Sequence, residues 1–382
     1  MRDTEHFVAK TYAGLEAILQ EELEKLGAQN CRLSTRAVEF DGDMAVLYRA
    51  NYICRFALRI LWQIHQFDFR DNNQFYSEIF KCPVEKMMTT EQTMAFSVTM
   101  SSDMFKTPLF AAQLAKDAVC DRFRDKYGKR PSVDKEMPDV RFHLHVFNQH
   151  ASLFLDASGE SLHKRGYRES VHPAQISEVT AAAMVKLSGW KADCDFIDPM
   201  CGSGTILIEA ALAALNVPAG FFRQDYGFFH WRNFDSGLWE RVLDEADIRD
   251  DVPVNFYGYD LSSRSIGMAR ANVTAARLED FIRLKPMNAL HVRPKRTPAI
   301  LMFNPPYGER LEVDDIEELY KNIGNTLKQN FAGCSAFIIS SNIQALKNIG
   351  LHPTRKMTLV NGPLECKFLR FDLYSGTKKL AY

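Results

Sequence analysis

The chain has 382 residues, 46% of them hydrophobic, so two or three domains with ample core are expected. Its net charge of −1 excludes a surface that is basic throughout, so any nucleic-acid binding must come from local patches. It contains no apolar stretch of the ~18–20 residues that a membrane helix needs and no signal-peptide layout at the N-terminus, and its eight cysteines are scattered, which together favour a cytoplasmic protein with reduced thiols.

The first sixty residues predict a small α+β module. Apolar positions at helical spacing predict a helix over Leu15–Leu26. A strand is expected over Arg36–Phe40 and a short helix over Asp43–Ala50.

Residues 61–160 predict a second α+β module. Strands are expected at Ala95–Met100 and Val140–Phe147, around a helix at Leu109–Arg124. Residues 145–156 predict a hairpin that turns at Asn148–His150. The basic run Arg122–Arg130 is either a nucleic-acid patch or a solvated face.

From about residue 176 onward, after a linker near 157–175, strands and helices alternate. This alternation predicts an α/β domain with a parallel, doubly wound sheet. Residues 217–250 are an apparent insertion crowded with aromatic rings. Exposed rings would stack on unpaired bases, but we expect most of them to pack the insertion onto the sheet.

A glycine-rich turn follows the first strand of this domain. The segment Phe196–Thr205 runs from a strand into a helix, and Gly202 and Gly204 allow the backbone to approach a ligand closely. The segment lacks the Gly-Lys-Ser/Thr of a Walker loop and the third glycine of a dinucleotide fingerprint. Asp198, just before the turn, is placed to hold a ligand's ammonium group.

The next strand, Val254–Asp260, ends in an acid. Asp260 is placed to bind both ribose hydroxyls of a nucleotide, as the acid at the end of the second strand does in nucleotide-binding βαβ units. It lies much farther from the glycines than the standard ~20 residues, which agrees with an insertion. The alternative is that Asp260 only caps a helix over Ser262–Ala276.

The segment Asn304-Pro305-Pro306-Tyr307 follows the apolar run Ala299–Phe303, which reads as a buried parallel strand. Two prolines cannot donate ladder hydrogen bonds, so the strand ends there, at the edge where open α/β sheets bind ligands. An amide, a carbonyl and an aromatic ring together suit a flat base that bears an exocyclic amine. A turn that only ends the strand is the alternative.

These pieces, in this order, resemble the class I S-adenosylmethionine-dependent methyltransferases that modify exocyclic amines. Residues 198–205, 304–311 and 162–168 look like the bacterial THUMP-domain guanine-N2 methyltransferases of 23S ribosomal RNA, sometimes labelled adenine-N6 DNA methylases. The resemblance spans nearly the whole chain. It implies a ferredoxin-like module over 1–60, a THUMP RNA-binding domain over 61–160 and a Rossmann-like methyltransferase domain over 161–382.

The resemblance also implies roles for particular residues. Asn304, Pro305 and Tyr307 would be catalytic: Asn304 Oδ1 and the Pro305 carbonyl would accept the amine hydrogens, and Tyr307 would stack on the flipped base. Asn288 stands where many relatives have an aspartate that contacts the cofactor's adenine amine. The expected cofactor residues are Asp198, Met200, Cys201, Gly202, Ser203, Gly204, Thr205, Asp260, Leu261, Asn288, Ala289 and Asn304.

The predicted RNA contacts are Lys164, Arg165, Tyr167 and Arg168, which precede the catalytic half of the chain. The expected partner is 23S ribosomal RNA or a ribosome assembly intermediate, with no membrane and no metal. Four alternatives remain: an adenine-N6 DNA methyltransferase with the same site, a tRNA guanine-N2 methyltransferase, a non-catalytic RNA-binding protein and a dinucleotide oxidoreductase. The sequence leaves the methylated nucleotide and the oligomeric state open.

Overall fold

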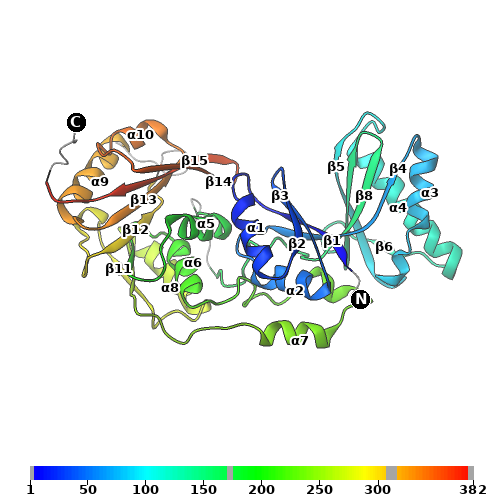
Figure 1. Ribbon diagram of the computed structural model, residues 1–382, viewed down its shortest axis with the longest axis horizontal. Helices are drawn as coiled ribbons and strands as arrows, with labels where there is room; N and C mark the ends of the chain where they lie inside the picture. The colour runs from blue at the N-terminus through cyan, green and yellow to red at the C-terminus, as the bar shows by residue number, and fades with distance from the viewer. Residues whose placement is uncertain (1–3, 170–174, 307–315, 377–382) are drawn as a thin grey trace. The chain divides into compact units, whose positions relative to one another are not determined.

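The computed structural model describes residues 4–169, 175–306 and 316–376 (Figure 1). The chain forms two compact units. Unit 1 contains Met1–Thr11, Glu16–Leu162 and Arg223–Glu245, and unit 2 contains Tyr12–Leu15, His163–Phe222 and Ala246–Tyr382. In the described parts of the chain, no helix is both long and apolar enough to cross a membrane.

Unit 1 is built on one eight-stranded sheet that spans both predicted front modules. The strand order is β2-β3-β1-β4-β8-β7-β5-β6, and the long strand β4 joins the two halves. The strands are β1 (Glu5–Lys10), β2 (Gln29–Ser34), β3 (Ala37–Gly42), β4 (Arg59–Asp68), β5 (Thr93–Ser101), β6 (Ser132–Val133), β7 (Val140–Phe147) and β8 (His150–Asp156).

The helices of unit 1 are α1 (Glu16–Lys25), α2 (Met44–Ile53), α3 (Asn72–Lys81), the 3-10 helix η1 (Val84–Lys86) and α4 (Pro108–Tyr127), with η2 (Gly227–His230) and α7 (Ser236–Asp244) from the insertion. Helices α1, α2 and α4 confirm the three sequence predictions to within a few residues, and the other helices were not predicted. Local chemistry sets their ends. Asp43 caps α2 by accepting from the backbone N–H of Val46 at 3.1 Å, and α4 begins at the Thr107–Pro108 cap and ends at Gly128 in the left-handed conformation.

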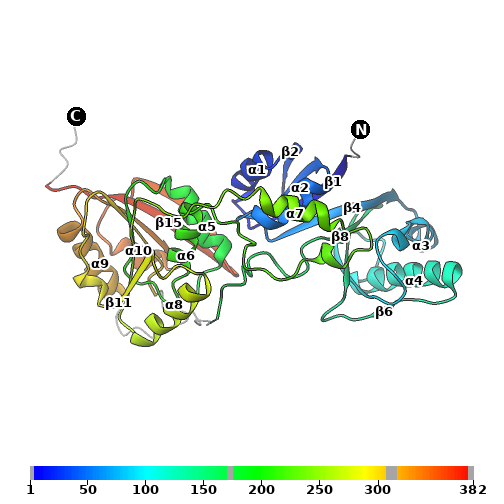
Figure 2. The same cartoon turned by 90° about the horizontal axis from the view of Figure 1, so that it is seen from below.

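The structure corrects the prediction for most of the aromatic insertion, because Arg223–Glu245 belongs to unit 1 and its aromatic rings pack within that unit. Helix α7 packs beside α2 (Figure 2). The ring of Tyr48 on α2 stacks on Phe228 with centroids 4.5 Å apart, and Trp239 meets Tyr48 edge-on at 6.1 Å. These rings therefore have the predicted packing role, but they pack against unit 1.

Unit 2 contains a seven-stranded sheet in the order β11-β10-β9-β12-β13-β15-β14. The first five are parallel, whereas β15 runs antiparallel to β13 and to β14, so the sheet is mixed where a parallel one was predicted. The strands are β9 (Asp195–Asp198), β10 (Phe256–Asp260), β11 (Ile282–Pro286), β12 (Ala299–Phe303), β13 (Ser335–Ser340), β14 (Arg355–Asn361) and β15 (Leu364–Asp372).

The helices of unit 2 are α5 (Glu178–Ser188), α6 (Thr205–Ala214), α8 (Ser263–Ala275), η3 (Ala289–His291), α9 (Ile316–Asn330) and α10 (Ile343–Lys347). Strands β9 and β12 are buried along their whole lengths, as a central strand covered on both faces requires. Tyr320 and Leu327 of α9 pack with Leu301 and Phe303 of β12 in one core cluster. This packing fixes the end of β12, where the candidate site begins.

Candidate functional site

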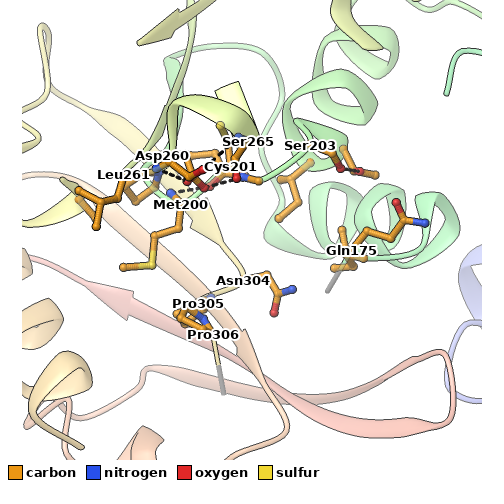
Figure 3. A pocket seen from close by; sticks show the side chains of 18 of the residues that line it. Gln175, Met200, Cys201, Ser203, Asp260, Leu261, Ser265, Asn304, Pro305 and Pro306 are labelled. Atoms are coloured by element: carbon orange, nitrogen blue, oxygen red, sulfur yellow. Dashed lines mark hydrogen bonds between the residues drawn. The ribbon is translucent and has the colours of Figure 1, made fainter. Parts of the chain in front are cut away.

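A cavity of about 560 Å³ lies at the carboxyl ends of β9, β10 and β12 in unit 2. Small-molecule sites typically have volumes of ~300–1,000 Å³. Strand β9 has β10 on one side and β12 on the other, which is the switch point where open α/β sheets bind ligands. The lining, most of which is drawn in Figure 3, comprises Gln175, Ile176, Asp198, Pro199, Met200, Cys201, Gly202, Ser203, Thr205, Ile206, Asp260, Leu261, Ser262, Ser265, Asn288, Ala289, Leu290, Asn304, Pro305, Pro306 and Leu319.

The turn from β9 into α6 forms one wall of the cavity, and its two glycines have different roles. Gly202 lines the cavity with φ of +54°, and the position of a Cβ there faces open space. Gly204 is not part of the lining. Its φ is +83°, and a Cβ would lie 3.3 Å from the Cβ of Ala269 on α8. The structure thus replaces the predicted ligand contact of Gly204 with close packing of α6 against α8.

The predicted neighbours Met200, Cys201, Ser203 and Thr205 line the same cavity. Burial raises the pKa of the Cys201 thiol well above its ordinary value, and the nearby carboxyls of Asp198 and Asp260 raise it further. A raised pKa favours the neutral thiol, which is a weaker nucleophile than the thiolate.

Asp198 is a carboxyl group buried in the cavity wall, with 1% of its surface exposed. Its Oδ1 accepts a hydrogen bond from the backbone N–H of Met200 at 3.1 Å. Burial raises the pKa of Asp198 well above its usual range, the Met200 bond opposes this, and Asp260 adds to it. A buried carboxyl of this kind gains stability when a cation binds beside it.

Asp260, at the end of β10, organises the backbone around the cavity. Its Oδ2 accepts from the N–H of Gly202 at 3.0 Å, and its Oδ1 accepts from the N–H of Ser262 at 2.9 Å. The cap of α8 is Ser262, whose Oγ accepts from the N–H of Ser265 at 3.2 Å. The alternative that Asp260 is only the helix cap is therefore wrong, and its carboxylate faces the cavity.

The predicted residues on the next two loops also reach the cavity. Leu261 lines it and is nevertheless 76% exposed. Asn288 caps η3 by accepting from the N–H of Leu290 at 3.0 Å through Oδ1, and Ala289 follows it in the lining. An amide oxygen has two lone pairs, so this bond leaves Asn288 able to accept a second one.

Asn304 directly follows β12, and it is half-buried. Figure 3 shows its side chain next to Pro305 and Pro306, below the glycine turn and Gln175 in this view. The structure therefore brings the predicted amine acceptors to the same cavity as the glycine turn. Tyr307, the predicted stacking residue, lies outside the described residues, as do residues 308–311.

The predicted RNA-contact segment is largely buried, which corrects most of that assignment. Arg165 and Tyr167 are 2% and 1% exposed, and the Tyr167 hydroxyl donates to Glu209 Oε1 at 2.9 Å. The Arg168 side chain is 13% exposed and pairs with Glu178 at 2.7 Å. A buried, internally paired cation cannot reach a phosphate without breaking its pairs. Lys164 alone of the four is exposed.

The other basic run, Arg122–Arg130, also has side chains that form ion pairs within unit 1. Arg122 donates to both carboxylate oxygens of Glu85 at 2.6 and 2.7 Å, and Lys126 donates to Glu85 at 2.8 Å. The Arg122 bond, although opposed by burial, is the main reason that the Glu85 pKa is lowered to about 2. These two side chains stabilise the fold of the front unit, so they are poor candidates for an RNA patch.

Several cavity residues were not predicted. Ser262 and Ser265 follow Asp260 closely, and their position after the strand was an available signal. Gln175 and Ile176 lie at the end of the linker, and Leu319 comes from α9. Outside the cavity lining, Glu209 is an acid inside an apolar helix, which was an available signal for its buried contact with Tyr167. Nothing in the local sequence marks Leu319, because only the packing of α9 brings it to the cavity.

Three family models together match most of the chain. Residues 165–370 match the model described as "RMKL-like, methyltransferase domain". Residues 6–61 match the RlmL ferredoxin-like domain, and residues 69–156 match the THUMP domain.

Two curated relatives illustrate the similarity. The ribosomal RNA large subunit methyltransferase K/L of Methylococcus capsulatus is 37% identical over 379 residues, which are 97% of this chain and 51% of that protein. The chain thus spans about half the length of such relatives. A Synechocystis protein, slr0064, named as a candidate RNA methyltransferase, is 34% identical over 374 residues, 97% of each chain.

Two solved structures share the fold over their full lengths. SMU.472, a candidate methyltransferase solved with SAH, has a TM-score of 0.86 and 29% identity, covering 99% of this chain and 100% of that one. A Listeria monocytogenes protein described as a predicted N6-adenine-specific DNA methylase also has a TM-score of 0.86, with 26% identity over 98% of this chain and 97% of that one. On these grounds the chain belongs to the THUMP-containing family of RMKL-like class I methyltransferases.

Proposed function

We propose that this chain transfers a methyl group from S-adenosylmethionine to the exocyclic N2 amine of a guanine in 23S ribosomal RNA. The observation that carries the proposal is the meeting of Asn304-Pro305 with the glycine turn and Asp198 around one cavity. Asn304 and Pro305 suit a base amine. The glycine turn and Asp198 suit a nucleoside that bears an ammonium group.

The residues of the cavity fit that cofactor. The buried Asp198 carboxyl suits the ammonium group, Asp260 suits the ribose hydroxyls, and Asn288 suits the adenine amine. Met200, Cys201 and Leu261 supply apolar contact, and Gly202 leaves room beside the turn. When bound, S-adenosylmethionine supplies a methyl group that its sulfonium already makes electrophilic.

The protein's part in the reaction is to prepare the amine. An aryl amine is a poor nucleophile because its lone pair is delocalised into the ring. Asn304 Oδ1 and the Pro305 carbonyl would accept the two amine hydrogens, which orients the lone pair and favours the charge that develops on nitrogen. No strong general base is needed, since the proton becomes acidic once the nitrogen is alkylated. We include stacking of the base on Tyr307 in the proposal.

The substrate part of the proposal rests on the relatives and on the front unit. The relatives named K/L are ribosomal RNA methyltransferases, and this chain has the THUMP domain that accompanies RNA substrates in the family. Lys164 remains our candidate RNA contact in the segment 164–168. The same acceptor pair would also seat an adenine N6 amine, so the product must be identified directly.

The test is single-turnover methylation of partly assembled 23S ribosomal RNA, with mass spectrometry of the product nucleosides. Asn304→Ala should lower the rate by ~10²-fold or more, on the scale of losing one preorganised polar group, while cofactor affinity changes little. Asn325→Ala, at an exposed position on α9, is the matched control. Near-wild-type methylation by Asn304→Ala would refute the proposed role of Asn304 in binding the base amine. N6-methyladenine as the product, or equal activity on duplex DNA, would refute the guanine-N2 assignment.

A further inference from the structure

The segment that precedes the cavity, residues 163–169, is held to the rest of unit 2 by polar contacts at three places. Arg168 makes the largest set of these contacts. Its Nε donates to Glu178 Oε1 at 2.7 Å, its Nη2 donates to the carbonyl of Ile176 at 3.2 Å, and its Nη1 donates to Gln175 Oε1. Gln175 and Ile176 line the cavity, so one guanidinium holds both a side chain and a backbone carbonyl of the cavity wall.

The chemistry of these contacts fixes more than position. A guanidinium only donates hydrogen bonds, so the oxygen of the Gln175 amide must face Arg168. The NH₂ group of Gln175 is then the donor that this side chain offers. Figure 3 shows Gln175 on the side of the pocket opposite Asp260 and Leu261. Arg168 thus sets both the position of the Gln175 side chain and the direction of its amide, on the wall opposite Asp260.

The same segment also holds the glycine turn. The backbone N–H of Glu169 donates to Asn272 Oδ1 at 2.9 Å, and Asn272 Nδ2 donates to the carbonyl of Ser203 at 3.0 Å. Asn272 is 1% exposed, so these bonds are shielded from water. One chain segment therefore contacts two parts of the cavity: the wall through Arg168 and the glycine turn through Asn272.

Contacts with α6 complete this arrangement. The Tyr167 hydroxyl donates to Glu209, and Arg165 Nε lies 3.7 Å from the same carboxylate oxygen. Glu209 lies on the helix that follows the glycine turn, and all three side chains are nearly inaccessible to solvent. The segment is therefore packed against α6 by buried polar contacts within unit 2.

We infer that Arg168 is a positioning residue for the cofactor cavity: it holds Gln175 and Ile176 in place so that the wall is formed before the ligand arrives. The inference deepens the proposed function, on which it rests for the identity of the ligand. Preorganisation of this kind acts on ligand affinity, because otherwise binding must order the wall. RNA affinity should not depend on Arg168, since its charge is directed inward.

Arg168→Lys separates this role from a phosphate contact. Lysine keeps the charge, so it would preserve a contact with RNA, but it lacks the planar fork that reaches three acceptors. We expect S-adenosylhomocysteine to bind the full-length Arg168→Lys protein ~10-fold or more weakly in calorimetry, on the scale of one lost bond from a charged donor. The KM for S-adenosylmethionine should rise while the RNA affinity stays at the wild-type value. Lys164→Gln, in the same segment, should leave S-adenosylhomocysteine binding unchanged.

A second variant keeps the test decisive if Arg168→Lys fails to fold. Gln175→Ala removes the clamped side chain without leaving a charge buried, and it should also weaken S-adenosylhomocysteine binding. The inference is overturned if either folded variant binds S-adenosylhomocysteine as the wild type does, or if Arg168→Lys loses RNA affinity and keeps cofactor affinity. Failure of the proposed function looks different: the wild-type chain itself would not bind S-adenosylhomocysteine or would not methylate RNA.

Discussion

Replacing Asp198 with asparagine should weaken cofactor binding and stabilise the cofactor-free protein at the same time. The carboxyl group is 1% exposed, and one backbone N–H, that of Met200, donates to it at 3.1 Å. Asparagine has nearly the same shape and can keep that bond through its amide oxygen. The substitution therefore removes the ionisable group and leaves the packing intact.

The expected loss of affinity follows from the proposed contact between Asp198 and the cofactor's ammonium group. A hydrogen bond between charged groups contributes about 1.5–3 kcal/mol, so Asp198→Asn should weaken S-adenosylmethionine binding by roughly 10–150-fold at neutral pH. S-adenosylhomocysteine, which carries the same ammonium group, should lose a similar factor. A cofactor fragment without the amino acid, such as methylthioadenosine, should bind both proteins alike.

The pH dependence has a definite sign. Because burial raises the folded-state pKa of Asp198, its contribution to folding stability is fully present below the unfolded pKa of ~3.9 and is lost as the pH rises through the folded value. The unfolding free energy of the cofactor-free wild type should therefore fall relative to Asp198→Asn as the pH increases. Over the same window, wild-type affinity for S-adenosylmethionine should rise, since the ammonium group prefers the ionised carboxylate.

Calorimetric titrations and denaturant melts of both proteins, each over a series of pH values, measure these two differences. Groups that titrate in both proteins cancel when one curve is subtracted from the other. Equal affinity of wild type and Asp198→Asn for S-adenosylmethionine at neutral pH would show that Asp198 does not hold the ammonium group, and the orientation proposed for the cofactor would be wrong.

Two further substitutions test the packing around the site and the insertion. Tyr48→Ala removes the ring that stacks on Phe228 at 4.5 Å, and it should destabilise unit 1 by about 3–5 kcal/mol in denaturant melts; a loss well below 1 kcal/mol would mean that the insertion adds little to that unit. Gly204→Ala places a Cβ 3.3 Å from the Cβ of Ala269 at a φ of +83°, whereas Gly189→Ala has a similar φ of +77° and open space. Each should cost about 1–2 kcal/mol for the left-handed backbone, and Gly204→Ala should melt at the lower temperature; equal melting temperatures would refute the packing role of Gly204.

The sequence alone determined the elements whose signals are local. Buried apolar runs such as Ala299–Phe303, the short helix predicted from Asp43 and the hairpin turn after Phe147 depend on neighbouring residues, and the structure has them within a few residues of the predicted ends. The order of the glycine turn, the acid at the strand end and the Asn-Pro-Pro segment also predicted where the cavity lies, because parallel strands place their carboxyl ends along one edge of the sheet.

Tertiary structure decided which partners the polar and aromatic side chains find. A basic segment reads the same whether its charges face RNA or buried carboxylates, so only the fold revealed that Arg165 and Arg168 face Glu209 and Glu178. The aromatic composition of the insertion predicted that its rings pack against other parts of the protein. It could not predict that Phe228 packs on Tyr48 of unit 1. Burial and pairing are properties of contacts between distant segments, and no local pattern encodes which distant segment will be there.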